Sequence, residues 1–201
     1  MSNIKFGKAS SKMKTRYIVR VAILSALSAV LYALPGIPVI PPIYKLDFSG
    51  IPVLIGGLLL GPVAGVIIAL IKDLTGLMHS SSAGVGELAD FICSVAMVIP
   101  TALIYRNTNK TSMKAIAFLL GVIVMAIAGA AANYWILIPF YVSPQMPLDS
   151  IVNMIAKTIP SVDSLGKLIF YATIPFNLLK GAVVAIVVWI LNLRLSKYLR
   201  M

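Results

Sequence analysis

The sequence predicts an all-α membrane protein, a bundle of six transmembrane helices with both termini in the cytoplasm. Three observations predict this fold. Hydrophobic residues make up 60% of the 201 residues and charged residues only 11%, which is more apolar surface than a soluble domain of this length can bury. Several apolar runs reach the roughly 20 residues needed to cross a bilayer core of about 30 Å. The basic residues, moreover, are concentrated in three segments.

These three basic segments orient the predicted helices in the membrane. They hold twelve of the 17 lysines and arginines and no acidic residue, so the positive-inside rule places them in the cytoplasm. Topology and contact with anionic lipid thus explain the net charge of +11, and no nucleic-acid partner is expected. We therefore divide the chain into a basic cytoplasmic N-terminal extension, residues 1–16, and a six-helix membrane domain, residues 17–201. The basic residues are Lys5, Lys8, Lys12, Lys14, Arg16, Arg20, Arg106, Lys110, Lys114, Arg194, Lys197 and Arg200.

The first predicted helix covers residues 17–34 and ends at the sequence PGIPVIPP, through which no helix continues. An outer loop with the sequence IYKLDFSG follows. Residues 51–77 are apolar again but contain Gly61 and Pro62, which fits one long helix or two that meet there. We favour two helices, because proline is preferred in the first turn of a helix.

The second half of the chain adds three predicted helices. After an outer loop with the sequence SSSAGVG, residues 87–105 return to the cytoplasm, and residues 115–141 cross outward again. A long polar loop over residues 142–167 precedes the last helix, residues 168–193. This count of six agrees with two cytoplasmic termini.

Small residues recur at a four-residue spacing, which allows membrane helices to approach one another closely. Gly57, Gly61 and Gly65 follow this spacing, as do Ala22 and Ala26 near the cytoplasmic end of the first helix. Such a pattern fits packing within the chain, and for the two alanines it also fits a surface that faces a partner protein.

Several motifs that enzymes commonly use are missing from the sequence. No Walker motif, G-x-x-x-x-G-K-[ST], occurs, so the chain does not hydrolyse ATP by that route. With one histidine, His79, and one cysteine, Cys93, the usual ligand count of a transition-metal site is not reached, and no metal is expected. Glu87 and Asp90 share one helical face, and three interpretations stay open: favourable charge at a helix N-terminus, ligand contact, or acid–base catalysis.

Polar residues in the outer halves of the later helices indicate a ligand site. Asn177 and Lys180 lie on one face of the last helix, and Asn133 lies toward the outer end of the fifth. A lysine at the centre of a membrane helix costs about 2.5–3.5 kcal/mol on insertion scales, so we expect Lys180 to face a cavity. The alternative is an ion pair with one of three acids, Asp73, Glu87 or Asp90.

Four stretches of the chain closely resemble the riboflavin-specific S components of energy-coupling factor (ECF) transporters: KLDFSGIPVLIGGLLLGPVAGVIIALIKDLTGLM, GELADFI, NYWILIPFY and PFNLLKG. The resemblance implies an S-component bundle whose membrane domain binds one vitamin near its outer face, with no cofactor beyond the transported riboflavin. It implies ligand contacts from Asn133, Asn177 and Lys180. It implies further contacts, in the loop after the first helix and around the fourth, from Leu46, Asp47, Phe48, Ala83, Gly84 and Glu87.

The resemblance also implies partners for the protein. Transport would require a membrane-embedded T component, which Ala22 and Ala26 would contact, and two cytoplasmic ATPases that supply the energy. The expected function is a riboflavin-capturing subunit, not an enzyme, that crosses a bacterial cell membrane several times. Alternatives are an S component for another vitamin, a stand-alone secondary transporter driven by protons, and a membrane enzyme, which the lack of an assembled catalytic group disfavours.

Overall fold

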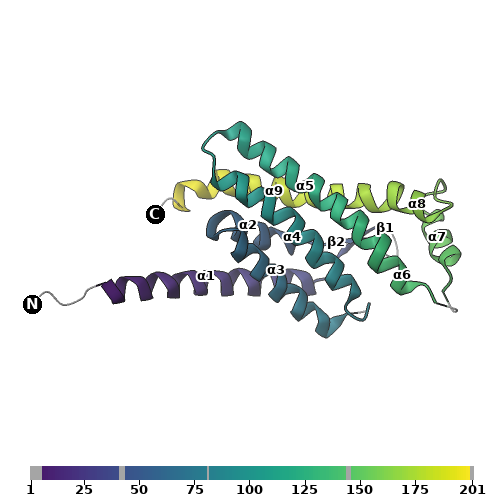
Figure 1. Cartoon of the computed structure of the whole chain (residues 1–201), viewed down its shortest axis with the longest axis horizontal. Helices are drawn as coiled ribbons and strands as arrows, with labels where there is room; N and C mark the ends of the chain where they lie inside the picture. The colour runs from purple at the N-terminus through teal and green to yellow at the C-terminus, as the bar shows by residue number, and fades with distance from the viewer. Residues whose placement is uncertain (1–5, 41–43, 81, 144–145, 200–201) are drawn as a thin grey trace, which may run out of the picture.

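The computed structural model describes residues 6–40, 44–80, 82–143 and 146–199, and it is mostly helical, as the composition predicts. The helices are α1 (Phe6–Ala33), α2 (Gly50–Leu60), α3 (Pro62–Gly76), η1 (Leu77–His79), α4 (Val85–Arg106), α5 (Thr111–Ala132), η2 (Asn133–Leu137), α6 (Ile138–Tyr141), α7 (Leu148–Ala156), α8 (Leu165–Leu168), η3 (Ile169–Thr173) and α9 (Ile174–Leu199). Helix α4 contacts α3 on one side and α5 on the other, α1 packs on α2 and α3, and α9 packs on α5 (Figure 1).

Two of the long helices contain a π-helical turn. Helices α5 and α6 are joined without a break through the π-turn η2, and α8 and α9 are joined through the π-turn η3. A π-turn adds one residue to a helical turn and is frequent at functional sites, because it redirects the side chains around it. Both π-turns lie toward the same end of the molecule (Figure 1).

Four helical stretches within the described residues are long and apolar enough to cross a membrane. Helices α2 and α3, with 11 and 15 residues, are shorter than the roughly 20 that a full crossing needs. They meet at Gly61, whose φ of 112° suits glycine, and Pro62 opens α3, so the predicted break into two helices is confirmed. The four stretches are Lys14–Ala33, Val85–Arg106, Thr111–Tyr141 and Leu165–Asn192.

The predicted boundary between an extension and a membrane domain at residue 16 is not a boundary of secondary structure. Helix α1 begins at Phe6 and continues through residue 16 to Ala33. Residues 1–5 of the predicted extension and residues 200–201 of the predicted membrane domain lie outside the described residues. The first turns of α1, the connection between α4 and α5, and the last turns of α9 gather at one end of the molecule (Figure 1).

The segment between α1 and α2, predicted to be a loop, forms an antiparallel hairpin of β1 (Ile37–Ile40) and β2 (Tyr44–Leu46). Its register pairs Ile37 with Leu46 and Ile40 with Tyr44, with an irregularity between them. Proline holds the chain extended and removes a hydrogen-bond donor, so the proline-rich stretch that ends α1 is compatible with a short edge strand.

The long polar loop predicted over residues 142–167 contains helix α7, which the sequence analysis did not predict. Its apolar residues Ile151, Val152 and Ile155 recur at helical spacing and are buried. They share a core with Tyr44 of the hairpin and Phe176 of α9. The hairpin and α7 therefore cover one end of the bundle together.

The small residues of α2 and α3 serve packing within the chain. A Cβ on Gly65 would lie 3.0 Å from the Cα of Gly57, so only glycine allows the two helices to approach this closely. Ala22 and Ala26 are different, because both are exposed on the surface of α1 while Ser25 between them is buried.

Candidate functional site

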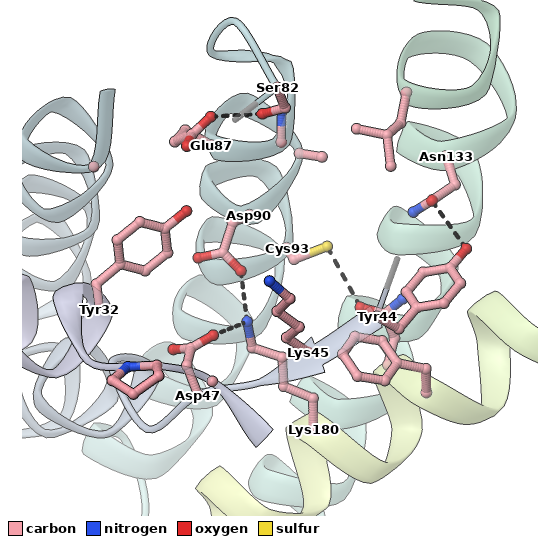
Figure 2. Close-up of a pocket in the computed structure, with 18 of the residues that line it drawn as sticks. Tyr32, Tyr44, Lys45, Asp47, Ser82, Glu87, Asp90, Cys93, Asn133 and Lys180 are labelled. Atoms are coloured by element: carbon pink, nitrogen blue, oxygen red, sulfur yellow. Dashed lines mark hydrogen bonds and ion pairs between the residues drawn. The ribbon is translucent and has the colours of Figure 1, made fainter. Parts of the chain in front are cut away.

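A cavity of about 810 Å³ opens at the end of the bundle that the hairpin and α7 cover. Its walls come from α1, the hairpin, the end of α3 with η1, α4, the π-turn η2 with α6, α7 and α9. This volume is within the range of about 300–1,000 Å³ that is usual for small-molecule sites. Figure 2 shows Lys180 between Asp47 and Asp90, with Tyr32 on one side and Tyr44 with Asn133 on the other.

Two asparagine amides line the cavity beside the two π-turns. Asn133 is the first residue of η2, and its Nδ2 donates to the carbonyl of Gly129 one turn earlier (2.8 Å). Asn177 repeats this contact in α9, where its Nδ2 donates to the carbonyl of Thr173 (2.9 Å). Each amide keeps a second N–H and carbonyl oxygen lone pairs, so the pair can both donate to a ligand and accept from it.

Gly129 makes room for the Asn177 side chain. A Cβ at position 129 would lie 2.6 Å from Cγ and Nδ2 of Asn177, closer than real Cβ atoms approach other atoms. The side chain of Asn177 therefore occupies the notch that glycine leaves in α5. Cys93 of α4, also in the cavity wall, donates its S–H to Asn177 Oδ1 (3.7 Å).

Lys180 is one of the charged residues in the cavity wall. Its Nζ donates to Asp90 Oδ1 and to Asp47 Oδ2, each at 2.7 Å. Of the three acids proposed from the sequence as ion-pair partners for this lysine, Asp90 is confirmed, whereas Asp73 and Glu87 pair elsewhere. Lys180 thus lines the cavity and is ion-paired at once, so the two interpretations of this residue are compatible.

Asp47 connects the hairpin to both α2 and α9. Its Oδ1 accepts from the backbone N–H of Ser49 at the start of α2 (2.9 Å), and its Oδ2 accepts from Lys180. Burial by itself would raise the pKa of the Asp47 carboxyl, but the Lys180 ammonium outweighs burial and holds that pKa below its usual range. Asp47 is therefore an anion at neutral pH.

A second lysine, Lys72, lies behind this wall and is not suggested by the sequence analysis. It is 0% exposed, pairs with Asp90 Oδ2 and lies 3.1 Å from Asp73 Oδ1. Its Nζ is 5.0 Å from the centre of the Tyr32 ring, within the range of a cation–π contact. The signal that could have revealed it is the adjacent pair of charges that interrupts the apolar run of α3.

Glu87 organises the serine-rich turn that precedes α4. Its Oε2 accepts from the hydroxyls of Ser80 (2.8 Å) and Ser82 (3.0 Å), and those hydroxyl oxygens accept backbone N–H groups of the same turn. The turn passes through Ala83 and Gly84, whose φ angles of 51° and 90° are left-handed. Glu87 lies in the first turn of α4, where a negative charge is favourable, and it also lines the cavity.

Tyr44 fastens the hairpin to both walls of the cavity. Its hydroxyl donates to Asn133 Oδ1 (3.2 Å) and lies 2.6 Å from Thr173 Oγ1, while its ring packs on Phe176 with centroids 4.9 Å apart. Burial raises the pKa of Tyr44 to about 12, so the hydroxyl stays protonated at any physiological pH. The sequence gives no sign of this role, because the tyrosine lies in a segment predicted to be a loop.

Five residues that the sequence or the resemblance predicted for the site line the cavity, namely Asp47, Glu87, Asn133, Asn177 and Lys180. The other four do not line it, and their contact with a ligand stays a prediction: Leu46, Phe48, Ala83 and Gly84. Leu46, the last residue of β2, is buried, and Phe48 is 39% exposed. Within the described residues, no group of three or more His, Cys, Asp or Glu could hold a metal ion.

The cavity suits a planar, neutral, polar-edged ligand. Aromatic and aliphatic side chains, including Tyr32, Phe176 and Ile138, provide apolar surface for a ring system. The two amides provide donors and acceptors for its polar edge. Asp47 and Asp90 pair with Lys180, so these three charged groups do not by themselves demand a ligand of either charge.

Comparison with known proteins gives consistent results. A model of the family described as ECF transporter, substrate-specific component, matches residues 16–192. The chain is 32% identical over 188 residues to "Riboflavin transporter RibU" of Staphylococcus aureus (strain TCH60), covering 93% of this chain and 94% of that protein. It is 30% identical over 195 residues to "Riboflavin transporter FmnP" of Bacillus subtilis (strain 168), with 93% and 95% covered. A solved structure described as "Structure and mechanism of the S component of a bacterial ECF transporter" matches with a TM-score of 0.74 and 31% identity, over 94% of this chain and 99% of that chain.

Proposed function

The chain belongs to the family of ECF transporter substrate-specific components, and from this premise we propose that it captures riboflavin for import. The resemblance seen in the sequence is confirmed by the family match, and the relatives of similar length are riboflavin transporters by name. The chain is a transport protein and not an enzyme, and its helices are those of a membrane protein.

The observation that carries riboflavin as the ligand is the pairing of two amides with an ammonium group in one cavity of sufficient size. The flavin ring is flat and largely apolar, and one edge carries carbonyl acceptors and an imide N–H. Asn133 and Asn177 can satisfy such an edge from two helices, and Lys180 can donate to a carbonyl or to a hydroxyl of the ribityl chain. The cavity volume of about 810 Å³ leaves room for both parts of the molecule.

The proposed topology is six crossings with both termini in the cytoplasm, in which α2 and α3 each make one crossing. Their shortness is compatible with local thinning of the bilayer around the bundle. The basic segments support the orientation, since the turns and connections that carry them gather at the end of the molecule opposite the hairpin (Figure 1). The cavity then opens on the outer side of a bacterial cell membrane.

The energy for import would come from partner proteins. The sequence contains no Walker motif, so we propose that a membrane-embedded T component and two cytoplasmic ATPases drive transport. Ala22 and Ala26 are the proposed contact with the T component, because both are exposed, small and four residues apart on α1. Large exposed apolar residues, among them Ile23 and Leu27, flank them on the same helix.

Titration of free riboflavin with the detergent-purified protein tests the proposed ligand. Bound flavin should lose its fluorescence at an equimolar ratio, and denaturation should release intact riboflavin. Lys180→Met should weaken binding about 10- to 150-fold, the effect of losing one hydrogen bond to a charged group. Lys167→Met is the matched control, because Lys167 is exposed and outside the cavity. Absence of quenching at micromolar protein would exclude riboflavin, and calorimetric titration with other vitamins would then identify the alternative.

A further inference from the structure

Lys72 lies behind the cavity wall rather than in it. No part of the residue is exposed, and it does not line the cavity. A buried ammonium without compensation is strongly unfavourable. Lys72 is compensated by Asp90, by Asp73 at 3.1 Å and by the ring of Tyr32 at 5.0 Å.

Asp90 divides its two carboxylate oxygens between two ammonium groups. Its Oδ2 pairs with Lys72, and its Oδ1 accepts from Lys180 at 2.7 Å. Lys180 in turn donates to Asp47. The five residues form one network across α3, α4, α9 and the segment that follows the hairpin, with three acids and two lysines: Asp47, Lys72, Asp73, Asp90 and Lys180.

We propose that Lys72 is a positioning residue for the binding site, an inference that rests on the proposed function. Lys72 neutralises Asp90 from the side away from the cavity, and so limits how strongly Asp90 attracts Lys180. An ammonium has three N–H donors, and Asp47 and Asp90 use two of those of Lys180. Without Lys72, the full charge of Asp90 would act on Lys180 and hold its ammonium away from a ligand.

A double-mutant cycle separates this role from a general effect on folding. Riboflavin affinity is measured by fluorescence quenching for the full-length wild type, Lys72→Met, Lys180→Met and the double variant. Lys72→Met should weaken binding about 3- to 30-fold, the size of coupling found within one ion-pair network. In the Lys180→Met background, the same change should alter the Kd by less than about 2-fold, because the residue through which Lys72 acts is gone.

Lys114→Met is the matched control. The Nζ of Lys114 lies 4.7 Å from the centre of the Tyr105 ring, so this change also removes an ammonium from an aromatic face, but outside the cavity. We expect it to leave the affinity unchanged. Should Lys72→Met not fold, the variant Lys72→Met with Asp73→Asn removes one cation and one acid, leaves the net charge of the network unchanged, and undergoes the same cycle.

The outcomes distinguish the inference from the function on which it rests. Wild-type protein that does not quench riboflavin fluorescence overturns the proposed function and this inference with it. Wild-type binding together with an unchanged Kd for Lys72→Met overturns the inference alone. The inference is also overturned if the losses of riboflavin affinity in the two single variants add up in the double variant, since additivity would mean that Lys72 acts without Lys180.

Discussion

Replacing Gly129 by alanine tests whether the position of Asn177 controls binding. The new Cβ would stand 2.6 Å from Cγ and Nδ2 of Asn177, whereas ordinary contact between such atoms begins at about 3.5 Å. The amide must therefore move by about 0.9 Å. A shift of this size distorts the hydrogen bond from Asn177 Nδ2 to the Thr173 carbonyl, now 2.9 Å long, and displaces the amide from the cavity wall.

The two effects of this change on stability nearly cancel, whereas its effect on binding does not. A lost hydrogen bond costs about 0.5–1.5 kcal/mol. Alanine in place of glycine in a helix interior stabilises by about 1 kcal/mol. The thermal unfolding midpoint should thus change little. A ligand that needs the amide loses one hydrogen bond, which corresponds to about 2- to 13-fold in Kd.

The assay is a riboflavin fluorescence titration paired with a thermal unfolding curve for each protein. Gly166→Ala is the matched control, because a Cβ at Gly166 in α8 meets nothing within 4 Å. The reasoning would be refuted by a Gly129→Ala variant with wild-type affinity. It would also be refuted by a variant whose loss of binding free energy is no larger than its loss of unfolding free energy.

Two further predictions concern the partner surface and the hairpin. Ala22→Trp with Ala26→Trp should leave riboflavin binding intact, because both residues are exposed and outside the cavity. The same double change should prevent assembly with the T component. A complex that still co-elutes on a sizing column would contradict this prediction. Asp47→Asn should destabilise the protein at pH 7 by about 1–3 kcal/mol, because Lys180 loses one charged partner. The pKa of Asp47 is held below its usual value of about 3.9. The difference in unfolding free energy between the wild type and Asp47→Asn should therefore be complete above pH 5 and disappear as the pH falls through that lower pKa. A difference that does not depend on pH would count against the ion pair.

The long helices could be predicted from the sequence because hydropathy alone specifies them. The apolar runs that become α1, α4, α5 and α9 need no partner to be recognised, and the break at Gly61 follows from local backbone preference. The hairpin could not be predicted in this way. It is stabilised by contacts such as that of Tyr44 with Asn133, which is 89 residues away in the sequence. Helix α7 did leave a signal in its helical spacing of isoleucines and valine, which the polar residues around it obscured.

Some residues of the candidate site could likewise be predicted from the sequence, and others could not. Asn133, Asn177 and Lys180 stand out because each is a polar residue in an apolar run, and the free energy of burying it requires an explanation. Lys72 does not stand out in this way, since a lysine near a helix end usually reaches the membrane interface. That Asp47 is a partner of Lys180 could not be inferred from spacing, because only tertiary structure brings the two residues together.

The order in which the ion pairs can form has a consequence for how the chain is made. Lys72 and Asp90 are 18 residues apart, so they can neutralise each other as soon as α3 and α4 have both left the ribosome. Lys180 and Asp47 are 133 residues apart, and α9 is synthesised after the other described helices. Until α9 inserts, Asp47 lacks the ammonium of Lys180 with which it pairs in the folded protein. The binding site is therefore completed only when α9 inserts, and a chain truncated before α9 would insert its early helices without ever acquiring the site.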